Sequence, residues 1–305
     1  MTHPMLMSTD TCREGSASAG GDSTGLVAFK NVLVGVDGTS AGRDAIAVGT
    51  MLRDPHGRLT LAHVVLAQGA IYRNFRSTTA GEQSHVLLER ERQAAGVSAE
   101  LTGMFAPSVA GGLHQLVEDC EADLLVVGSC ARGSVERLLR GDDTQGALRG
   151  AACAVAVAPR GCAERPKRID SIGVAYNNTS ESERAVSAAR TLAARHGAAL
   201  RAMTVVRPPG LSAIAGSRWA MTLDALEEAA LDRLRSLGDV AGRVTVGPPE
   251  LELAVFGDEL DLLVIGSRGH GPLRRLLLGS TTAHLARSAR CPVLVLPQGC
   301  RPRVR

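Results

Sequence analysis

The stretch NVLVGVDGTSAGRDAI, residues 31–46, begins as an apolar run, passes through a short turn and continues with apolar residues at helical spacing. A second stretch, IDSIGVAYNNTSESERAV at 169–186, repeats this order, and Asp37 aligns with Asn177. A short apolar strand that leads through a turn into a helix is typical of βα units. The sequence therefore predicts the same strand–turn–helix unit in two copies.

The repetition extends through the rest of the chain. The matching segments are LTLAHVV (59–65) with LRAMTVV (200–206), DLLVVGS (123–129) with DLLVIGS (261–267), and CAVAVAPRGC (153–162) with CPVLVLPQGC (291–300). Repetition over this length indicates two homologous domains rather than a solenoid of short units. We expect domains at 29–160 and 168–298, joined by a charged, proline-containing linker, and a disordered Ser/Thr/Gly-rich tail at 1–28.

The alternation of apolar strands and helical stretches predicts an α/β fold. Each half should form an open, mostly parallel sheet with helices on both faces. The 305 residues suit two domains, and with only 2% aromatic residues the core must be built from Ala, Val and Leu. Right-handed crossovers would bring loops and helix N-termini together at the carboxyl edge of the strands, where such folds bind ligands.

Composition excludes several classes of protein. The net charge of +3 and the scarcity of aromatic residues argue against nucleic-acid binding. No apolar run reaches the ~18 residues that a membrane helix needs, and the N-terminus lacks the pattern of a signal peptide. The seven cysteines form no CxxC motif and no zinc-site spacing, so we expect reduced thiols and no metal site. These features favour a cytoplasmic protein.

The stretch GSRGHGPLRRLLLGST, 266–281, lies between a predicted strand and a predicted helix. Glycines allow close approach of the backbone to a ligand, and the helix N-terminus, with Ser280 at or near the N-cap, favours an anion. Arg268, Arg274 and Arg275 add charge of the right sign. On spacing alone, a phosphate cradle and a Gly-rich turn with solvated arginines both remain open.

The corresponding stretch of the first half, GSCARGSVERLLRGDD at 128–143, is altered. Its three arginines are balanced by three acidic residues, whereas 266–281 has a net charge of +3. Asp142 stands where the second half has Ser280, and a carboxylate near a helix N-terminus would compete with phosphate. We therefore expect a phosphate group to bind mainly in the second half, with the first half structural; two occupied sites remain the alternative.

The pattern Gly266-x-x-Gly269, nine residues, then Gly279-Ser280 resembles the ATP-binding signature of the universal stress protein family. The segments VGVDGT, HVV and CPVLVLP also resemble that family, so both halves are covered. The resemblance implies a tandem protein in which each half is a five-stranded parallel sheet of order 3-2-1-4-5. It also implies pairing of the last strands, 153–158 against 291–296, within one chain; a homodimer stays open.

The resemblance further implies an adenine nucleotide as ligand and a role as a nucleotide-responsive stress or dormancy regulator. ATP is the expected cofactor, with AMP left open and Mg²⁺ only as the companion of ATP. The implied contacts in the second half are Asn177, Val205, Gly266, Arg268, Gly269, Gly279, Ser280 and Thr281. Less favoured equivalents in the first half are Asp37, Val64, Gly128 and Gly141. Because Asn replaces Asp at 177, the nucleoside contact would be altered rather than excluded.

Two other classes of function remain as alternatives. Residues 38–42, GTSAG, match the GxSxG pattern of a hydrolase nucleophile at Ser40, although Thr39 or Ser40 is better explained as a helix N-cap. No general base is identifiable beside the phosphates, so no catalytic residue is assigned and at most weak ATP hydrolysis is expected. His63 is expected to be a core or edge histidine. A slow ATPase or hydrolase, and a nucleotide-free structural interaction protein, are the alternatives.

Overall fold

The computed structural model describes residues 29–66, 78–129, 143–165, 168–208, 217–267 and 279–297. The predicted tail at 1–28 lies outside these ranges. So do the predicted contact residues Arg268, Gly269 and Gly141.

In both halves strands alternate with helices. The first half holds β1 (Phe29–Gly35), α1 (Ser40–Leu52), β2 (Arg53–Leu66), α3 (Thr78–Ala95), β3 (Glu100–Ala106), α4 (Val109–Asp119), β4 (Leu124–Gly128), α5 (Asp143–Leu148), β5 (Ala154–Ala158) and a 3₁₀ turn, η1 (Cys162–Glu164). The second half holds β6 (Ser171–Ala175), α6 (Ser180–His196), β7 (Ala199–Val206), α7 (Ser217–Arg235), β8 (Ala241–Val246), α8 (Pro249–Gly257), β9 (Leu262–Gly266), α9 (Ser280–Ser288) and β10 (Val293–Leu296).

The strands of the described residues form a ten-stranded sheet of order β3-β2-β1-β4-β5-β10-β9-β6-β7-β8. Each half is parallel within itself and has the predicted order 3-2-1-4-5. The halves meet where β10 pairs antiparallel with β5, with Val293 opposite Val157. Both seam strands begin later than the sequence suggested, at Ala154 and Val293 rather than at the preceding cysteines. Because the seam is antiparallel, the carboxyl edges of the two halves point in opposite directions.

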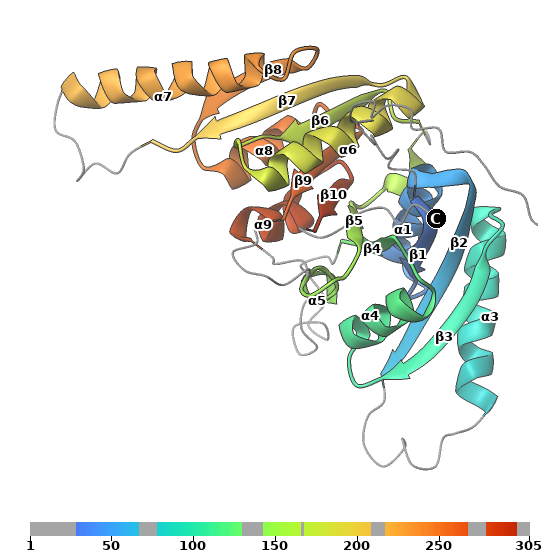
Figure 1. The fold of residues 1–305 in the computed structure, drawn as a ribbon. Coiled ribbons are helices and arrows are strands. Elements are labelled where there is room, and N and C mark those ends of the chain that lie inside the picture. The colour runs from blue at the N-terminus through green and yellow to red at the C-terminus, as the bar shows by residue number, and fades with distance from the viewer. Residues whose placement is uncertain are drawn as a thin grey trace, which may run out of the picture.

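Helices cover both faces of the sheet (Figure 1). Helices α1, α3, α6 and α7 contribute to the core on one face, and α4, α5, α8 and α9 to the core on the other. Within β1, Val32 and Val34 face the first core and Leu33 the second, as the period of a strand requires. At the seam, the small side chains of Ala154 and Ala156 are fully buried. The low aromatic content is thus accommodated by closely packed helices and strands.

The backbone conformation of the turns from β1 to α1 and from β6 to α6 explains which residues stand in them. Gly38 has φ +75° and Asn178 has φ +58°, a left-handed conformation that glycine and asparagine adopt most easily. Thr39 is the N-cap of α1, and its hydroxyl accepts a hydrogen bond from the Ala41 amide at 3.2 Å. Thr179 is the N-cap of α6 within a capping box. The predicted role of Thr39 as an N-cap is confirmed.

Contacts near the linker hold α1 against the η1 turn and against the second half. The Asp44 carboxylate on α1 is 2% exposed and accepts hydrogen bonds from the amides of Gly161 and Ala163, at 3.1 and 2.8 Å. Arg195, in the last turn of α6, donates to the carbonyls of Leu52, at 3.4 Å, and Arg53 at the C-terminus of α1. A cation at this position complements the helix dipole. The linker and α6 therefore both hold α1 in place.

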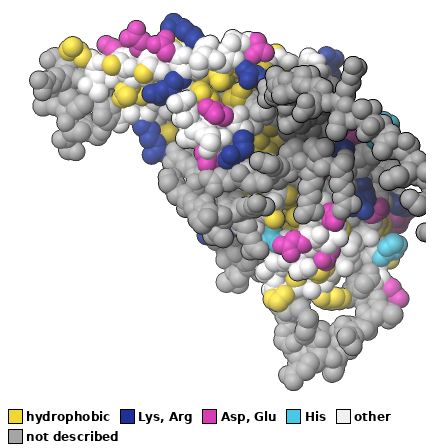
Figure 2. Space-filling model, in the orientation of Figure 1, with side chains coloured by type: hydrophobic (Ala, Val, Ile, Leu, Met, Phe, Trp, Pro, Cys, Tyr) yellow, Lys and Arg dark blue, Asp and Glu magenta, His cyan; other side chains and the backbone are white. Residues whose placement is uncertain are grey.

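The surface carries mixed charge. Acidic and basic side chains are interspersed over the face drawn in Figure 2. Among the described residues, several arginines form ion pairs, such as Arg201 with Glu259 at 3.1 Å. In the part of the chain that the structure describes, no helix has both the length and the apolar character needed to cross a bilayer.

Candidate functional site

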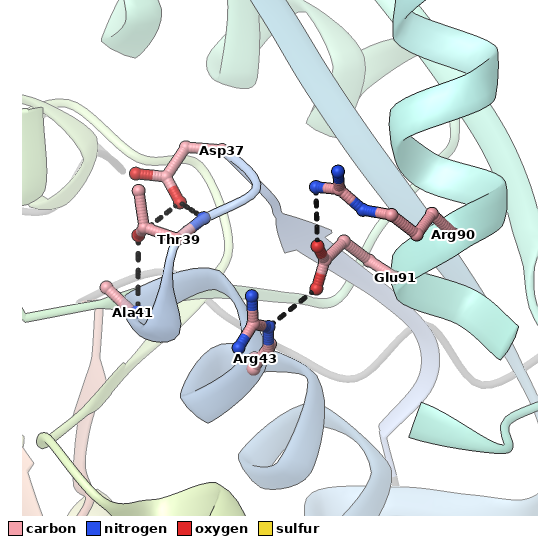
Figure 3. A network of polar contacts seen from close by, with 6 residues as sticks. All are labelled: Asp37, Thr39, Ala41, Arg43, Arg90 and Glu91. Atoms are coloured by element: carbon pink, nitrogen blue, oxygen red, sulfur yellow. Dashed lines mark hydrogen bonds and ion pairs between the residues drawn. The ribbon is translucent and has the colours of Figure 1, made fainter. Parts of the chain in front are cut away.

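In the first half, Asp37 lies at the carboxyl edge of the sheet, directly after β1 and Val36. Its Oδ1 atom accepts hydrogen bonds from the Thr39 amide at 3.0 Å and from the Thr39 hydroxyl at 2.6 Å (Figure 3). The side chain is exposed. The predicted carboxylate is thus presented at the edge where α/β folds bind ligands, in an orientation fixed by the helix cap.

In the second half, Asn177 occupies the equivalent place after β6. Its Oδ1 atom accepts a hydrogen bond from the Thr179 hydroxyl at 2.8 Å. The neighbouring Asn178 side chain accepts from the Tyr176 hydroxyl at 3.0 Å, which steadies the turn. Asn177 therefore keeps the hydroxyl contact of Asp37, whereas the Thr179 amide donates to the Ser182 hydroxyl instead. Its own amide nitrogen adds a donor that a carboxylate lacks.

Val64 and Val205 lie near the carboxyl ends of β2 and β7, as predicted. Val64 pairs with Met104 of β3, and Val205 pairs with Thr245 of β8. Both strands continue for only one or two residues beyond these positions. Their backbone groups therefore lie beside the Asp37 and Asn177 turns, at the same edges of the sheet.

His63 lies next to Val64 on β2 and is half-buried. Its Nδ1 atom is 3.0 Å from the hydroxyl of Ser84, which is itself buried. Burial lowers the pKa of His63, while the negative charge of Asp37 raises it in part. The histidine is thus packed against α3 by Ser84, consistent with the expected core or edge position.

We expect an NMR titration to place the pKa of His63 below the usual value of about 6.5. Asp37→Asn should lower that pKa further, because the substitution removes the carboxylate that favours the imidazolium. The lowered pKa of His63 also makes stability depend on pH. Because His63 binds a proton at higher pH in the unfolded chain than in the folded chain, it lowers the free energy of unfolding as pH drops below about 6.5. An upward shift in Asp37→Asn would contradict the assigned interaction.

Close packing explains why the residues at the ends of β4 and β9, Gly128 and Gly266, are glycines, and the sequence alone did not indicate this reason. A Cβ atom at Gly128 would lie 2.3 Å from the Ala41 carbonyl oxygen, and one at Gly266 would lie 2.6 Å from the Glu181 carbonyl oxygen. These carbonyls belong to the first turns of α1 and α6. The first glycine of each candidate phosphate signature therefore makes room for a helix, whether or not a ligand is bound.

Helix α9 follows β9 in the chain, and its N-cap residue contributes no side-chain hydrogen bond. Its N-cap is Gly279, with Ser280 and Thr281 as the first helical residues. Ser280 was expected at or near the N-cap, and it lies one residue inside. In the first half, the Thr144 hydroxyl near the start of α5 donates to the Gly128 carbonyl at 2.9 Å.

Ser267 is a further residue of interest that the sequence did not single out. Its side chain is 1% exposed, and its hydroxyl is a buried polar atom without a hydrogen-bond partner in the structure as described. Its amide donates to the Leu296 carbonyl at 2.9 Å, which fixes its position after β9. Buried hydroxyls are normally hydrogen-bonded, so this atom offers a donor at the start of the glycine-rich stretch.

The chain matches the model of the universal stress protein family over residues 28–159 and 168–297. A universal stress protein of Mycobacterium tuberculosis is 29% identical over 270 residues, which cover 84% of this chain and 90% of that protein. The crystal structure of a universal stress protein from Archaeoglobus fulgidus covers 88% of this chain and 99% of its own, with a TM-score of 0.60 and 20% identity, a likeness of fold. Both halves match the family model, so this chain belongs to the universal stress protein family and carries two of its domains in tandem.

Proposed function

We propose that the protein binds ATP in its second half and acts in the cytoplasm as a nucleotide-responsive regulator of stress or dormancy. The observation that carries this proposal is the N-terminus of α9, which begins at Gly279 without a side-chain cap. Free amides and the helix dipole make such an N-terminus favourable for phosphate. The buried Ser267 hydroxyl, which has no hydrogen-bond partner among the described residues, adds a donor at the start of the glycine-rich stretch.

The residues present fit this ligand. The backbone amides of Ser280 and Thr281 would hold phosphate oxygens, together with Gly269 and Arg268 of the glycine-rich stretch. Gly266 keeps the strand end close to α6. The remaining implied contacts, Asn177 and the backbone of Val205, would serve the nucleoside. Mg²⁺ would enter only with ATP, where it neutralises phosphate charge.

The first half is proposed not to hold a triphosphate. Asp142 stands at the position of Ser280, and the stretch 128–143 has no net charge. A carboxylate there would occupy the amides at the start of α5 and repel phosphate. The first half instead supplies half of the continuous sheet through β5.

Calorimetric titration with ATP tests this assignment, and one tight site per chain is the expected result. Mass spectrometry of nucleotide released from gently purified protein would identify ATP or AMP as the natural ligand. Two tight sites per chain would contradict the assignment to the second half, and no binding of either nucleotide would favour the structural interaction protein. A phosphate-release assay tests weak hydrolysis separately.

A further inference from the structure

Two arginines of the first half are held by one buried carboxylate. The Glu91 side chain on α3 is 2% exposed, and its two oxygens accept from Arg43 Nε at 2.9 Å and from Arg90 at 3.0 Å (Figure 3). The two arginine side chains are 53% and 66% exposed. Each guanidinium group is therefore anchored at one nitrogen while much of its surface faces solvent.

This cluster, Arg43, Arg90 and Glu91, lies against the Asp37 turn. Arg43 is in the first turns of α1, four residues after the N-cap Thr39. A terminal nitrogen of Arg90 is 3.4 Å from where a Cβ of Gly38 would be. Both guanidinium groups thus flank the carboxyl edge of the sheet, where ligands bind in this architecture.

The second half has the opposite charges at the equivalent positions. Aligning the N-caps Thr39 and Thr179 places Glu183 at the position of Arg43. Aligning Gly96 and Gly238, which both have positive φ just after the helices α3 and α7, places Arg233 at the position of Glu91. Glu183 and Arg233 both act on the pKa of Tyr176, so they lie near its turn. Glu183 and Arg233 thus lie near the Asn177 turn of the second half, whereas the Asp37 turn of the first half has Arg43 and Arg90 beside it.

The number of cations exceeds what a simple cross-helix ion pair needs. A single arginine would neutralise Glu91, and exposed ion pairs contribute little to stability. Arg presents five N–H donors in a planar fork that matches phosphate oxygens, and it stays charged at all physiological pH values. Anchoring one nitrogen on a buried carboxylate orients the remaining donors before a ligand arrives, which reduces the cost of ordering on binding.

We propose that the first half carries a phosphate-binding site of its own, formed by Arg43 and Arg90 and positioned by Glu91. Its ligand is inorganic phosphate or the phosphate of a small phosphomonoester. The site is distinct from the proposed ATP cradle, because it lies in the other half and uses side chains of α1 and α3 instead of a glycine-rich loop.

The test is an NMR titration of the full chain at constant ionic strength, observing the arginine Nε–Hε signals. Inorganic phosphate is the first probe, and glycerol 3-phosphate and 5′-AMP distinguish a phosphomonoester from the free ion. We expect saturable shifts of the Arg43 and Arg90 signals, assigned with Arg43→Ala and Arg90→Ala. Each substitution should weaken binding at least about tenfold, since each removes charge-assisted hydrogen bonds.

Glu91→Gln separates a positioned site from general attraction by positive charge. The substitution raises the net charge, so unspecific attraction predicts tighter phosphate binding, whereas loss of the anchor predicts binding about threefold to tenfold weaker. Arg233→Ala, at the equivalent position of the second half, is the matched control and should leave these signals and their affinity unchanged. If Arg43→Ala fails to fold, Arg43→Lys keeps the charge but loses the fork and should bind with intermediate affinity. Tighter binding in Glu91→Gln, or the absence of saturable shifts, would overturn the proposal.

Discussion

Ser280→Asp is expected to weaken ATP binding by at least about 100-fold, or roughly 3 kcal/mol. Ser280 is the first residue of α9, whose N-cap Gly279 contributes no side-chain hydrogen bond. A carboxylate at this position would accept hydrogen bonds from the free amides and repel the phosphates. The substitution introduces into the second half the residue type that Asp142 supplies at the equivalent position of the first half. Calorimetric titration of both variant and parent protein measures the loss.

Ser280→Asn is the matched control, because asparagine has nearly the shape of aspartate without its charge. We expect it to retain ATP affinity within about fivefold, since an amide side chain can cap the helix but does not repel phosphate. Thermal unfolding of both variants should show that the fold is retained. Equal losses in the two variants would mean that bulk at position 280, rather than charge, matters; unchanged binding in Ser280→Asp would place the phosphates elsewhere.

Much of the fold could be predicted from the sequence because the repeat is long and its strands are strongly apolar. DLLVVGS and DLLVIGS become β4 and β9, and the resemblance gave the strand order on both sides of the seam. The turn residues were also informative, since Gly38 and Asn178 both adopt positive φ and Thr39 caps its helix. Local signals of this kind depend only on neighbours in the chain.

Contacts between residues distant in sequence could not be predicted in the same way. Arg43 and Glu91 lie 48 residues apart, and only the packing of α1 against α3 brings their charges together. The glycines at the ends of β4 and β9 show the same dependence on distant residues. The sequence favours their interpretation as ligand contacts, whereas the structure packs the first turns of α1 and α6 against them.

Gly128→Ala is expected to lower the free energy of unfolding by about 3 kcal/mol, at the upper end of the cost of overpacking. The added Cβ would lie 2.3 Å from the carbonyl oxygen and 2.8 Å from the Cβ atom of Ala41, so α1 itself would have to move. Gly35→Ala is the matched control: it also lies at the end of a central strand, but its Cβ would meet its nearest neighbour, a side-chain atom of Leu113, at 3.5 Å. Its cost should stay below about 1 kcal/mol, since this is ordinary van der Waals contact. Urea unfolding of both variants measures the difference.

Gly266→Ala extends the argument to the proposed ATP half. Its Cβ would lie 2.6 Å from the Glu181 carbonyl oxygen, so we expect a similar loss of stability, present without nucleotide. If this glycine served only to let phosphate approach, the substitution would leave the nucleotide-free protein as stable as the parent and would weaken ATP binding alone. Unfolding measured with and without ATP therefore separates the two roles. A cost near that of Gly35→Ala in the absence of ATP would show that α6 can yield, and the ligand would then be the reason for glycine at this position.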